Sequence, residues 1–248
     1  MIRTETNNGI RTIRMDRPEK KNALTGTMYE AMAEALEDAD MAEDVRVSLI
    51  LGGPGAFTAG NDIADFMKVA ETGQGLGTEV IRFLKAIAAS QKPVLAAVDG
   101  LAIGVGATML MHCDMVFASP RATIRTPFLD LGLVPEAAST LLAPAIMGPQ
   151  RAFELLCLGA PLDAEAAFRA GLVNHVVEEG ALEETALAAA RTIAAKPPAA
   201  LAIARRFLRG DREAIIARID EESAAFRARL QSDEARAAFA AFMARSKG

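Results

Sequence analysis

The stretch that decides the fold is residues 96–106, which read Ala96-Ala97-Val98-Asp99-Gly100-Leu101-Ala102-Ile103-Gly104-Val105-Gly106. An apolar strand here runs into a glycine turn and then into the first turn of a helix. The first backbone N–H groups of a helix have no acceptor within the helix, and they lie in the partly positive field at its end. Such groups suit a bound anion or a developing oxyanion.

A second segment, residues 56–63, follows another predicted strand and reads Ala56-Phe57-Thr58-Ala59-Gly60-Asn61-Asp62-Ile63. Taken alone, it is typical of a tight turn. Gly60 would supply an unusual backbone angle, and Asp62 would cap the following helix. The pattern of this segment by itself therefore favours a structural role over a chemical one.

The composition predicts a chain that can bury a sizeable core, because 51% of its 248 residues are hydrophobic. No apolar run reaches the roughly 18 residues of a membrane span. The polar N-terminus argues against a signal peptide, and the final Ser246-Lys247-Gly248 is not a peroxisomal address. A net charge of −5 argues against nucleic acid as a partner. With Cys113 and Cys157 interpreted as lone buried thiols, we expect a cytoplasmic protein.

Hydrophobic periodicity predicts strands and helices in the first part of the chain. The expected strands are residues 10–15, 45–51, 94–98, 115–118, 122–125 and 172–177. A capping box at Thr27 and Glu30 predicts a helix. Another helix is expected after Pro135, with an interruption at Pro144, and Asp163 is expected to cap a third helix. These elements indicate an α/β fold.

The last third of the chain is predicted to be almost wholly helical from Ala181. Lys196-Pro197-Pro198 is the one plausible boundary, between a core of residues 1–195 and a tail of residues 196–248. The tail carries more apolar side chains than a solvated appendage needs, namely Ala224, Phe226, Leu230, Phe239 and Phe242. Such a face is expected to be buried against the same subunit or a neighbour.

Several common motifs are absent or incomplete. The run from Gly104 to Gly106 lacks the third glycine of a dinucleotide fingerprint. No glycine loop is followed by a Lys-Ser or Lys-Thr pair, so there is no P-loop. No Gly-x-Ser-x-Gly nucleophile elbow occurs. The two histidines, His112 and His175, belong to no metal-spaced cluster, and His112 is interpreted as a core or interface residue.

Three sequence boxes occur in a fixed order. They are Arg17-Pro18-Glu19-Lys20-Lys21-Asn22-Ala23-Leu24, then Phe57 to Asp62, then Ala97 to Gly106 followed by Cys113-Asp114. Together they resemble the crotonase (enoyl-CoA hydratase/isomerase) superfamily, and the resemblance covers essentially the whole chain. It implies a crotonase-like α/β fold of repeated ββα units. It also implies that the C-terminal helical region assembles a homotrimer or a dimer of trimers.

In that superfamily, two backbone N–H groups hold the carbonyl oxygen of an acyl-CoA thioester as it gains negative charge. By position, the resemblance assigns these donors to Asn61 and Val105, although the family usually has glycine at the second place. The implied substrate-binding residues are Lys20, Lys21, Ala23, Ala59, Gly60, Asn61, Asp62, Ile63, Gly104 and Val105. The two lysines are expected near the phosphates, or else form only a solvated face. No cofactor is implied, because coenzyme A is part of the substrate.

Residues that line an acyl tunnel are harder to assign. Phe66, Met67, Ile81 and Leu84 are apolar at helical spacing, so they line a tunnel or only pack a helix. The sequence gives packing a slight preference.

The reaction depends on the acid/base residues. Family hydratases resemble one another in carrying two glutamates, and this chain has Thr108 and Phe128 at the matching positions. Neither side chain can take a proton from water. The stretch from Thr126 to Ser139 instead resembles enoyl-CoA isomerases in which the glutamate of a Pro-Glu pair, here Glu136, is the catalytic base. The resemblance therefore implies β,γ- to α,β-enoyl-CoA isomerisation through a thioester enolate.

The pattern around Glu136 leaves a structural alternative, because Pro135 followed by Glu136 is also a common helix start. A helix N-terminus lowers a carboxyl pKa, so a base there needs apolar surroundings, which Phe128, Leu133 and Val134 would provide. Asp130 is the reserve candidate for the base.

Two further functions stay open on the sequence alone. One is an enoyl-CoA hydratase or acyl-CoA hydrolase on the same fold. The other is a non-catalytic acyl-CoA-binding or assembly module.

Overall fold

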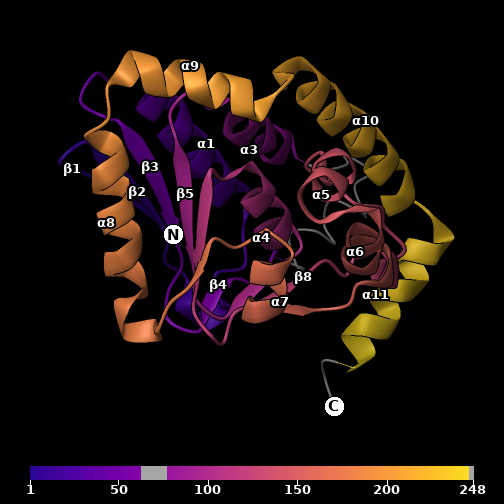
Figure 1. Cartoon of the computed structure of the whole chain (residues 1–248). Helices are drawn as coiled ribbons and strands as arrows, with labels where there is room; N and C mark the ends of the chain where they lie inside the picture. Colours follow the sequence, from indigo (N-terminus) through magenta and orange to yellow (C-terminus); the bar gives the residue numbers. More distant parts are fainter. Residues whose placement is uncertain (63–76, 246–248) are drawn as a thin grey trace.

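Two sheets of mostly parallel strands form the centre of the molecule (Figure 1). The computed structural model describes residues 1–62 and 77–245. The larger sheet contains, in spatial order, β1 Ile2–Asn7, β2 Ile10–Met15, β3 Val47–Leu51, β5 Val94–Val98, β7 Met115–Ala118 and β10 His175–Val176. The smaller sheet contains β4 Ala56–Thr58, β6 Leu101–Ile103, β8 Thr123–Arg125 and β9 Leu162–Asp163. The pairs β1–β2 and β8–β9 are antiparallel, and the other pairs are parallel.

The chain alternates between the two sheets. Strands β3, β5 and β7 lie in the larger sheet, and the strand that follows each of them, β4, β6 or β8, lies in the smaller sheet. After β6 the chain enters the short helix α4 Val105–Thr108. This is the repeated strand-strand-helix architecture that the family resemblance implies, and the α/β fold class is confirmed.

The larger sheet is covered on both faces. Every residue of β3 and β5 is buried. Because side chains alternate along a strand, Val47, Leu49 and Leu51 face α8 Leu182–Ala194, whereas Ile50 faces the core under α1 Gly26–Met41 and α3 Thr78–Ala89. Burial on both faces explains why these strands read as continuous apolar runs.

Two predicted helix features are wrong in detail. The cap of α1 is Thr25 rather than Thr27, because Thr25 is extended and its Oγ1 accepts a bond of 3.4 Å from the N–H of Met28. The helix after Pro135 begins only at Ser139, as α5 Ser139–Met147, and it continues through Pro144. Two shorter helices follow, α6 Pro149–Phe153 and α7 Ala164–Arg169, and Asp163 caps α7 as predicted.

The predicted strand over residues 172–177 is also shorter than expected, since only His175–Val176 pairs with β7. The described chain after Ala181 is helical, as predicted, through α8, α9 Pro198–Arg209, α10 Arg212–Leu230 and α11 Asp233–Arg245. In Figure 1 α8 lies on the left, α9 runs across the top, and α10 and α11 continue down the right, with α10 packed against α3. None of the helices in residues 1–62 and 77–245 combines the length and the apolar character needed to cross a membrane.

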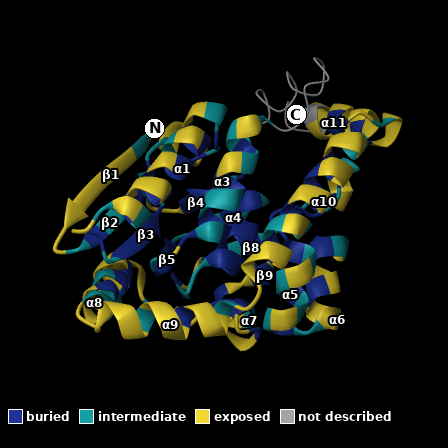
Figure 2. Ribbon diagram, turned by 90° about the horizontal axis from the view of Figure 1, so that it is seen from above, coloured by how far each residue is buried: buried dark blue, intermediate teal, exposed yellow. Residues whose placement is uncertain are grey.

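The apolar face predicted for the tail is buried mainly in the same chain. Phe226, Leu230 and Phe239 are buried, and the Phe226 ring meets Phe128 edge to face at 6.3 Å between centroids. These buried members need no neighbouring subunit to cover them, whereas Ala224 and Phe242 of the same predicted face are exposed. Figure 2 shows instead that α9 is largely exposed. The large apolar side chains that α9 exposes are Ile203, Phe207 and Leu208. The trimer and the boundary at residue 196 stay predictions.

Candidate active site

The two glycine segments of the sequence meet through β4 and β6. These strands pair in parallel, and Gly60 follows β4 with φ +86°, in the left-handed region that favours glycine. A Cβ atom on Gly60 would lie 2.8 Å from the backbone oxygen of Ile103. A Cβ atom on Gly106 would overlap the side chain of Thr58. The glycines therefore allow the chain after β4 and the chain after β6 to touch directly.

The N–H groups of Asn61 and Val105 lie at the ends of these touching segments. Asn61 forms a parallel bridge with Leu24. Its bonds run from Leu24 N to Gly60 O at 2.8 Å and from Asp62 N to Leu24 O at 2.9 Å. In such a bridge the N–H of the central residue points away from the partner strand. Val105 is the first residue of α4, so its N–H has no acceptor within that helix.

Asn22 fastens the first sequence box to this region. Its side chain is buried and donates to the backbone oxygens of Ala56 at 2.9 Å and Phe57 at 3.2 Å. Its Oδ1 accepts a bond of 2.7 Å from Arg17 N. The box is therefore held against β4 by one amide side chain that uses both of its ends.

The predicted phosphate neighbours lie on the same loop. Lys20 and Lys21 are exposed, and Ala59 N donates to Lys21 O at 2.9 Å. Asp62 pairs with Arg17 at 2.6 Å, so this carboxylate is already matched by a cation. The structure thus brings the lysines beside the segment expected to bind substrate.

The remaining predicted binding residues fall into three groups. Ala23 lies on the loop beside Asn61, and Gly104 precedes Val105 with φ +57°. Ile63, like the tunnel candidates Phe66 and Met67, lies outside the described residues. Ile81 and Leu84 pack in the core of the molecule, with Leu84 fully buried.

Glu136 is a buried carboxylate, 4% exposed, that touches the helix of the second glycine segment. Its Oε1 accepts a bond of 2.5 Å from the Thr108 hydroxyl. Burial raises the pKa of Glu136 from 4.5 to about 8; the bond from Thr108 lowers it, and the nearby charge of Glu222 raises it further. A carboxylate with such a proton affinity can both take and return a proton near neutral pH.

The turn that carries Glu136 is strained. Ala137 and Ala138 have φ values of 62° and 54°, which side-chain-bearing residues rarely adopt. Because α5 begins only at Ser139, Glu136 is not in its first turn, and the interpretation of Glu136 as a helix-start residue is wrong. His112 holds the turn, since its Nε2 lies 2.7 Å from Ala137 O. His112 is fully buried, as expected of a core histidine.

Tyr29 joins the two halves of the site, and the sequence reasoning missed it. From α1 its hydroxyl donates to Asn61 Oδ1. Its pKa is raised well above 10, first by burial and then by the charge of Glu136. The sequence feature that could have pointed to Tyr29 is its hydroxyl, because the neighbouring residues on the buried face of α1, such as Met28 and Met32, are apolar.

The reserve candidate for the base lies elsewhere. The Asp130 side chain is 53% exposed and pairs with Arg125 at 2.9 Å. Phe128, which occupies the place of a hydratase carboxylate, is buried against Phe226. The geometry therefore favours Glu136 over Asp130 as the acid/base group.

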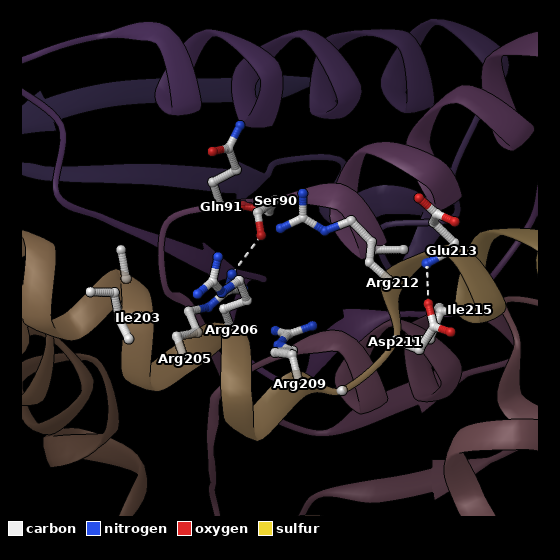
Figure 3. Close-up of a pocket in the computed structure, with 13 residues that line it drawn as sticks. Ser90, Gln91, Ile203, Arg205, Arg206, Arg209, Asp211, Arg212, Glu213 and Ile215 are labelled. Atoms are coloured by element: carbon white, nitrogen blue, oxygen red, sulfur yellow. Dashed lines mark hydrogen bonds between the residues drawn. The ribbon is translucent and has the colours of Figure 1, made fainter.

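Figure 3 shows a different pocket, next to the segment that leads into β5. Its lining includes Ser90, Arg205, Arg206, Arg209 and Arg212. Arg205 and Arg209 bind Asp114 at 2.9 and 3.1 Å, so this aspartate of the third sequence box anchors α9 to the core. The pocket does not contain the residues around Glu136, and we do not include it in the site.

The two touching segments leave the N–H groups of Asn61 and Val105 without an acceptor in their own bridge or helix, and the buried carboxylate of Glu136 bonds to the helix that Val105 begins. Residues 5–248 match the family model described as enoyl-CoA hydratase/isomerase, and the chain belongs to this family.

Three similar proteins illustrate the family. The chain is 35% identical to enoyl-CoA delta isomerase 2 of Rattus norvegicus over 96% of this chain, although it spans only 62% of the length of that protein. It is 34% identical to 1,2-epoxyphenylacetyl-CoA isomerase of Escherichia coli strain K12, over 83% of this chain and 80% of the relative. A solved enoyl-CoA hydratase/isomerase from Pseudoalteromonas atlantica T6c is 41% identical with a TM-score of 0.93, covering 98% of this chain and 97% of that one.

Proposed function

We propose that this protein isomerises β,γ-unsaturated acyl-CoA thioesters to the α,β form, with Glu136 as the proton-transferring residue. The observation that carries the proposal is the buried Glu136 carboxylate bonded to Thr108, where Thr108 and Phe128 stand in place of the hydratase glutamates. The relative named enoyl-CoA delta isomerase 2 supports the same choice.

The reaction needs one carboxylate and a stabilised oxyanion. Glu136 takes a proton from the α-carbon, and the electron pair of that C–H bond moves into a dienolate. The same carboxyl then gives the proton to the γ-carbon, so that the double bond lies between the α- and β-carbons. The N–H groups of Asn61 and Val105 would hold the thioester oxygen while it is negatively charged. Losing one such donor typically costs about 3–4 kcal/mol of transition-state stabilisation.

The expected binding mode places coenzyme A along the loop from Lys20 and on the chain after β4. Lys20 and Lys21 would meet phosphates, because they are exposed and lie beside Ala59. The backbone around Gly60 and Asn61 would meet the thioester. No cofactor beyond the coenzyme A of the substrate is needed. The cytoplasmic location and the trimer stay predictions.

The test is a panel of β,γ- and α,β-unsaturated acyl-CoA thioesters assayed for double-bond migration and for hydration. Migration is expected to be the faster reaction by orders of magnitude, because Thr108 and Phe128 have no carboxylate of their own to activate water. Efficient hydration of crotonyl-CoA, at a rate comparable with migration, would contradict the proposal and favour a hydratase. Thermal stabilisation by acyl-CoA without turnover would favour a binding module.

A further inference from the structure

A second buried carboxylate lies close to the base, and it comes from the C-terminal tail. Glu222, on α10, is 6% exposed. Its Oε1 accepts bonds from Thr140 N at 3.1 Å and from the Thr140 hydroxyl at 2.5 Å. Its Oε2 is buried and finds no hydrogen-bond partner in the part of the chain that the structure describes. A buried carboxylate with one unmatched oxygen is costly, so it calls for a reason.

The segment that Glu222 holds is the one that carries Glu136. Helix α5 has Ala138 at its N-cap, which offers no side-chain acceptor for the first N–H groups of the helix. Glu222 supplies that acceptor from another helix, at the end where a negative charge is favoured. The fixed point at Thr140 lies four residues after Glu136.

The bond between Glu222 and Thr140 matters because the turn between Glu136 and Thr140 is strained. Ala137 and Ala138 are both left-handed, and such residues persist only where their surroundings hold them. His112 holds the turn at the Ala137 oxygen, and Glu222 holds it at Thr140. The position of the Glu136 carboxylate is thus set from two sides, once from the core and once from the tail.

The charge of Glu222 acts on the same site. Burial raises the pKa of Glu222. The hydrogen bonds from the Thr140 hydroxyl and from the N–H groups of Thr140 and Ala138, together with the charge of Arg218, lower this pKa and so oppose the effect of burial. Arg218 donates to the Thr140 hydroxyl at 2.9 Å, so the proton of that hydroxyl is directed at Glu222. These donors favour the ionised form.

The other titratable groups around the turn are the base Glu136, Tyr29 of α1 and the buried His112. Burial lowers the pKa of His112 to about 4, so this histidine is neutral near pH 7. An ionised Glu222 repels a negative charge on Glu136.

We propose that Glu222 is a positioning residue for the reaction, which fixes the strained turn after Glu136 and places a second negative charge beside the base. The inference rests on the proposed isomerase function. It gives the tail a role within its own subunit, because α10 completes the surroundings of the acid/base group.

Two substitutions separate charge from geometry. Glu222→Gln keeps an oxygen for the Thr140 donors but removes the charge, so the acid limb of the kcat/KM profile should move to lower pH while kcat above that limb changes little. Glu222→Asp keeps the charge but is one methylene shorter. It should lower kcat roughly 10- to 100-fold through a misplaced turn, with KM and the acid limb nearly unchanged. Glu213→Gln, an exposed carboxylate on the same helix, is the matched control and should resemble the unmodified protein.

The pKa of Glu136 should also be followed without turnover, by NMR of 13C-labelled glutamate carboxyls, with Glu136→Gln identifying the signal. The Glu136 titration should move to lower pH in Glu222→Gln. An unchanged titration and acid limb in Glu222→Gln would overturn the inference, whatever the stability of the variant. Loss of folding in Glu222→Gln would also overturn it, since that change relieves repulsion and keeps the contact with Thr140. Full activity of Glu136→Gln would instead contradict the proposed function. Failure of the inference about Glu222 and failure of the proposed function are therefore distinguishable.

Discussion

The two halves of the site are built in different ways. The thioester half consists of backbone, from the chain after β4 and the first turn of α4, and glycines allow those segments to touch. The acid/base half is a side chain on a strained turn, held by Thr108 and His112 from one segment of the core and by Glu222 from the C-terminal tail. By the proposed assignment, the first half would hold the thioester oxygen and the second half would select the reaction.

The largest expected effect is in the acid/base half. Glu136→Gln keeps size and polarity but cannot take a proton, so kcat should fall by about 10²–10⁴-fold or more. Binding of acyl-CoA should persist, because the proposed contacts with coenzyme A lie elsewhere. The measurement pairs steady-state kinetics with calorimetric titration of a non-reacting acyl-CoA.

The stability of Glu136→Gln provides a second reading of the same variant. The folded-state pKa of about 8 is above the ordinary value of 4.5, so the unmodified protein loses stability as the pH rises through this range. Glu136→Gln should therefore be the more stable protein at pH 8–9 in urea denaturation. A variant that is less stable but active would mean that Glu136 is only structural.

Gly60→Ala tests whether the close approach of the two backbone segments is needed for activity. The new Cβ would lie 2.8 Å from Ile103 O at a φ of +86°, so the chain after β4 must move away from the end of β6. Left-handed strain for a non-glycine residue costs about 1–3 kcal/mol, and misplacement of the Asn61 N–H should lower kcat/KM at least tenfold. Gly55→Ala is a matched control, because its φ is also positive but its surroundings are open. Equal losses in both variants would show that strain alone matters.

Thr108 gives a smaller effect with a defined sign. Its hydroxyl lowers the pKa of Glu136, so Thr108→Val should raise that pKa further and move the acid limb of kcat/KM to higher pH. At pH 7 the kcat/KM of Thr108→Val should be lower than that of the unmodified protein, because a smaller fraction of Glu136 is ionised. At a pH above the acid limb, kcat/KM should return to the value of the unmodified protein. A shift to lower pH would mean that Thr108 does not stabilise the carboxylate.

The smallest effect is expected for Tyr29→Phe. This change removes the hydroxyl that holds the Asn61 side chain, and a neutral hydrogen bond contributes about 0.5–1.5 kcal/mol. Since the N–H of Asn61 is untouched, kcat/KM should fall by no more than about tenfold. A loss as large as that of Glu136→Gln would assign Tyr29 a direct part in proton transfer.

The same contrast explains what the sequence predicts. The glycine segments are local patterns, so the strand over residues 94–98, the turn at Gly60 and the start of α4 at Val105 follow from short stretches of chain. Strands β1, β6 and β9 are not among the expected strands, and β6 lies between the glycine turn and the helix. The partners of the base are not local. Thr108 is 28 residues from Glu136, and Glu222 is 82 residues from Thr140. No periodicity joins such positions.

The tail shows a related limit. Its apolar face is visible in the sequence, but hydrophobicity does not say which surface will cover it. Phe226 packs on Phe128 of its own chain. The exposed apolar residues Phe207 and Leu208 lie on α9 instead, outside the face that motivated the prediction of a trimer. Sedimentation of the full chain at micromolar concentration checks that prediction, and a monodisperse monomer would contradict it.

The proposed reaction requires that one buried carboxyl, that of Glu136, carries a proton from the α-carbon to the γ-carbon. Its most direct test is a β,γ-unsaturated acyl-CoA with deuterium at the α-carbon, converted in ordinary water and followed by NMR and mass spectrometry. Because Glu136 is only 4% exposed, we predict that part of the deuterium is found at the γ-carbon of the α,β-unsaturated product and that little 3-hydroxyacyl-CoA forms. A product whose γ-carbon carries protons from water alone, or a predominant 3-hydroxyacyl-CoA, would contradict the account.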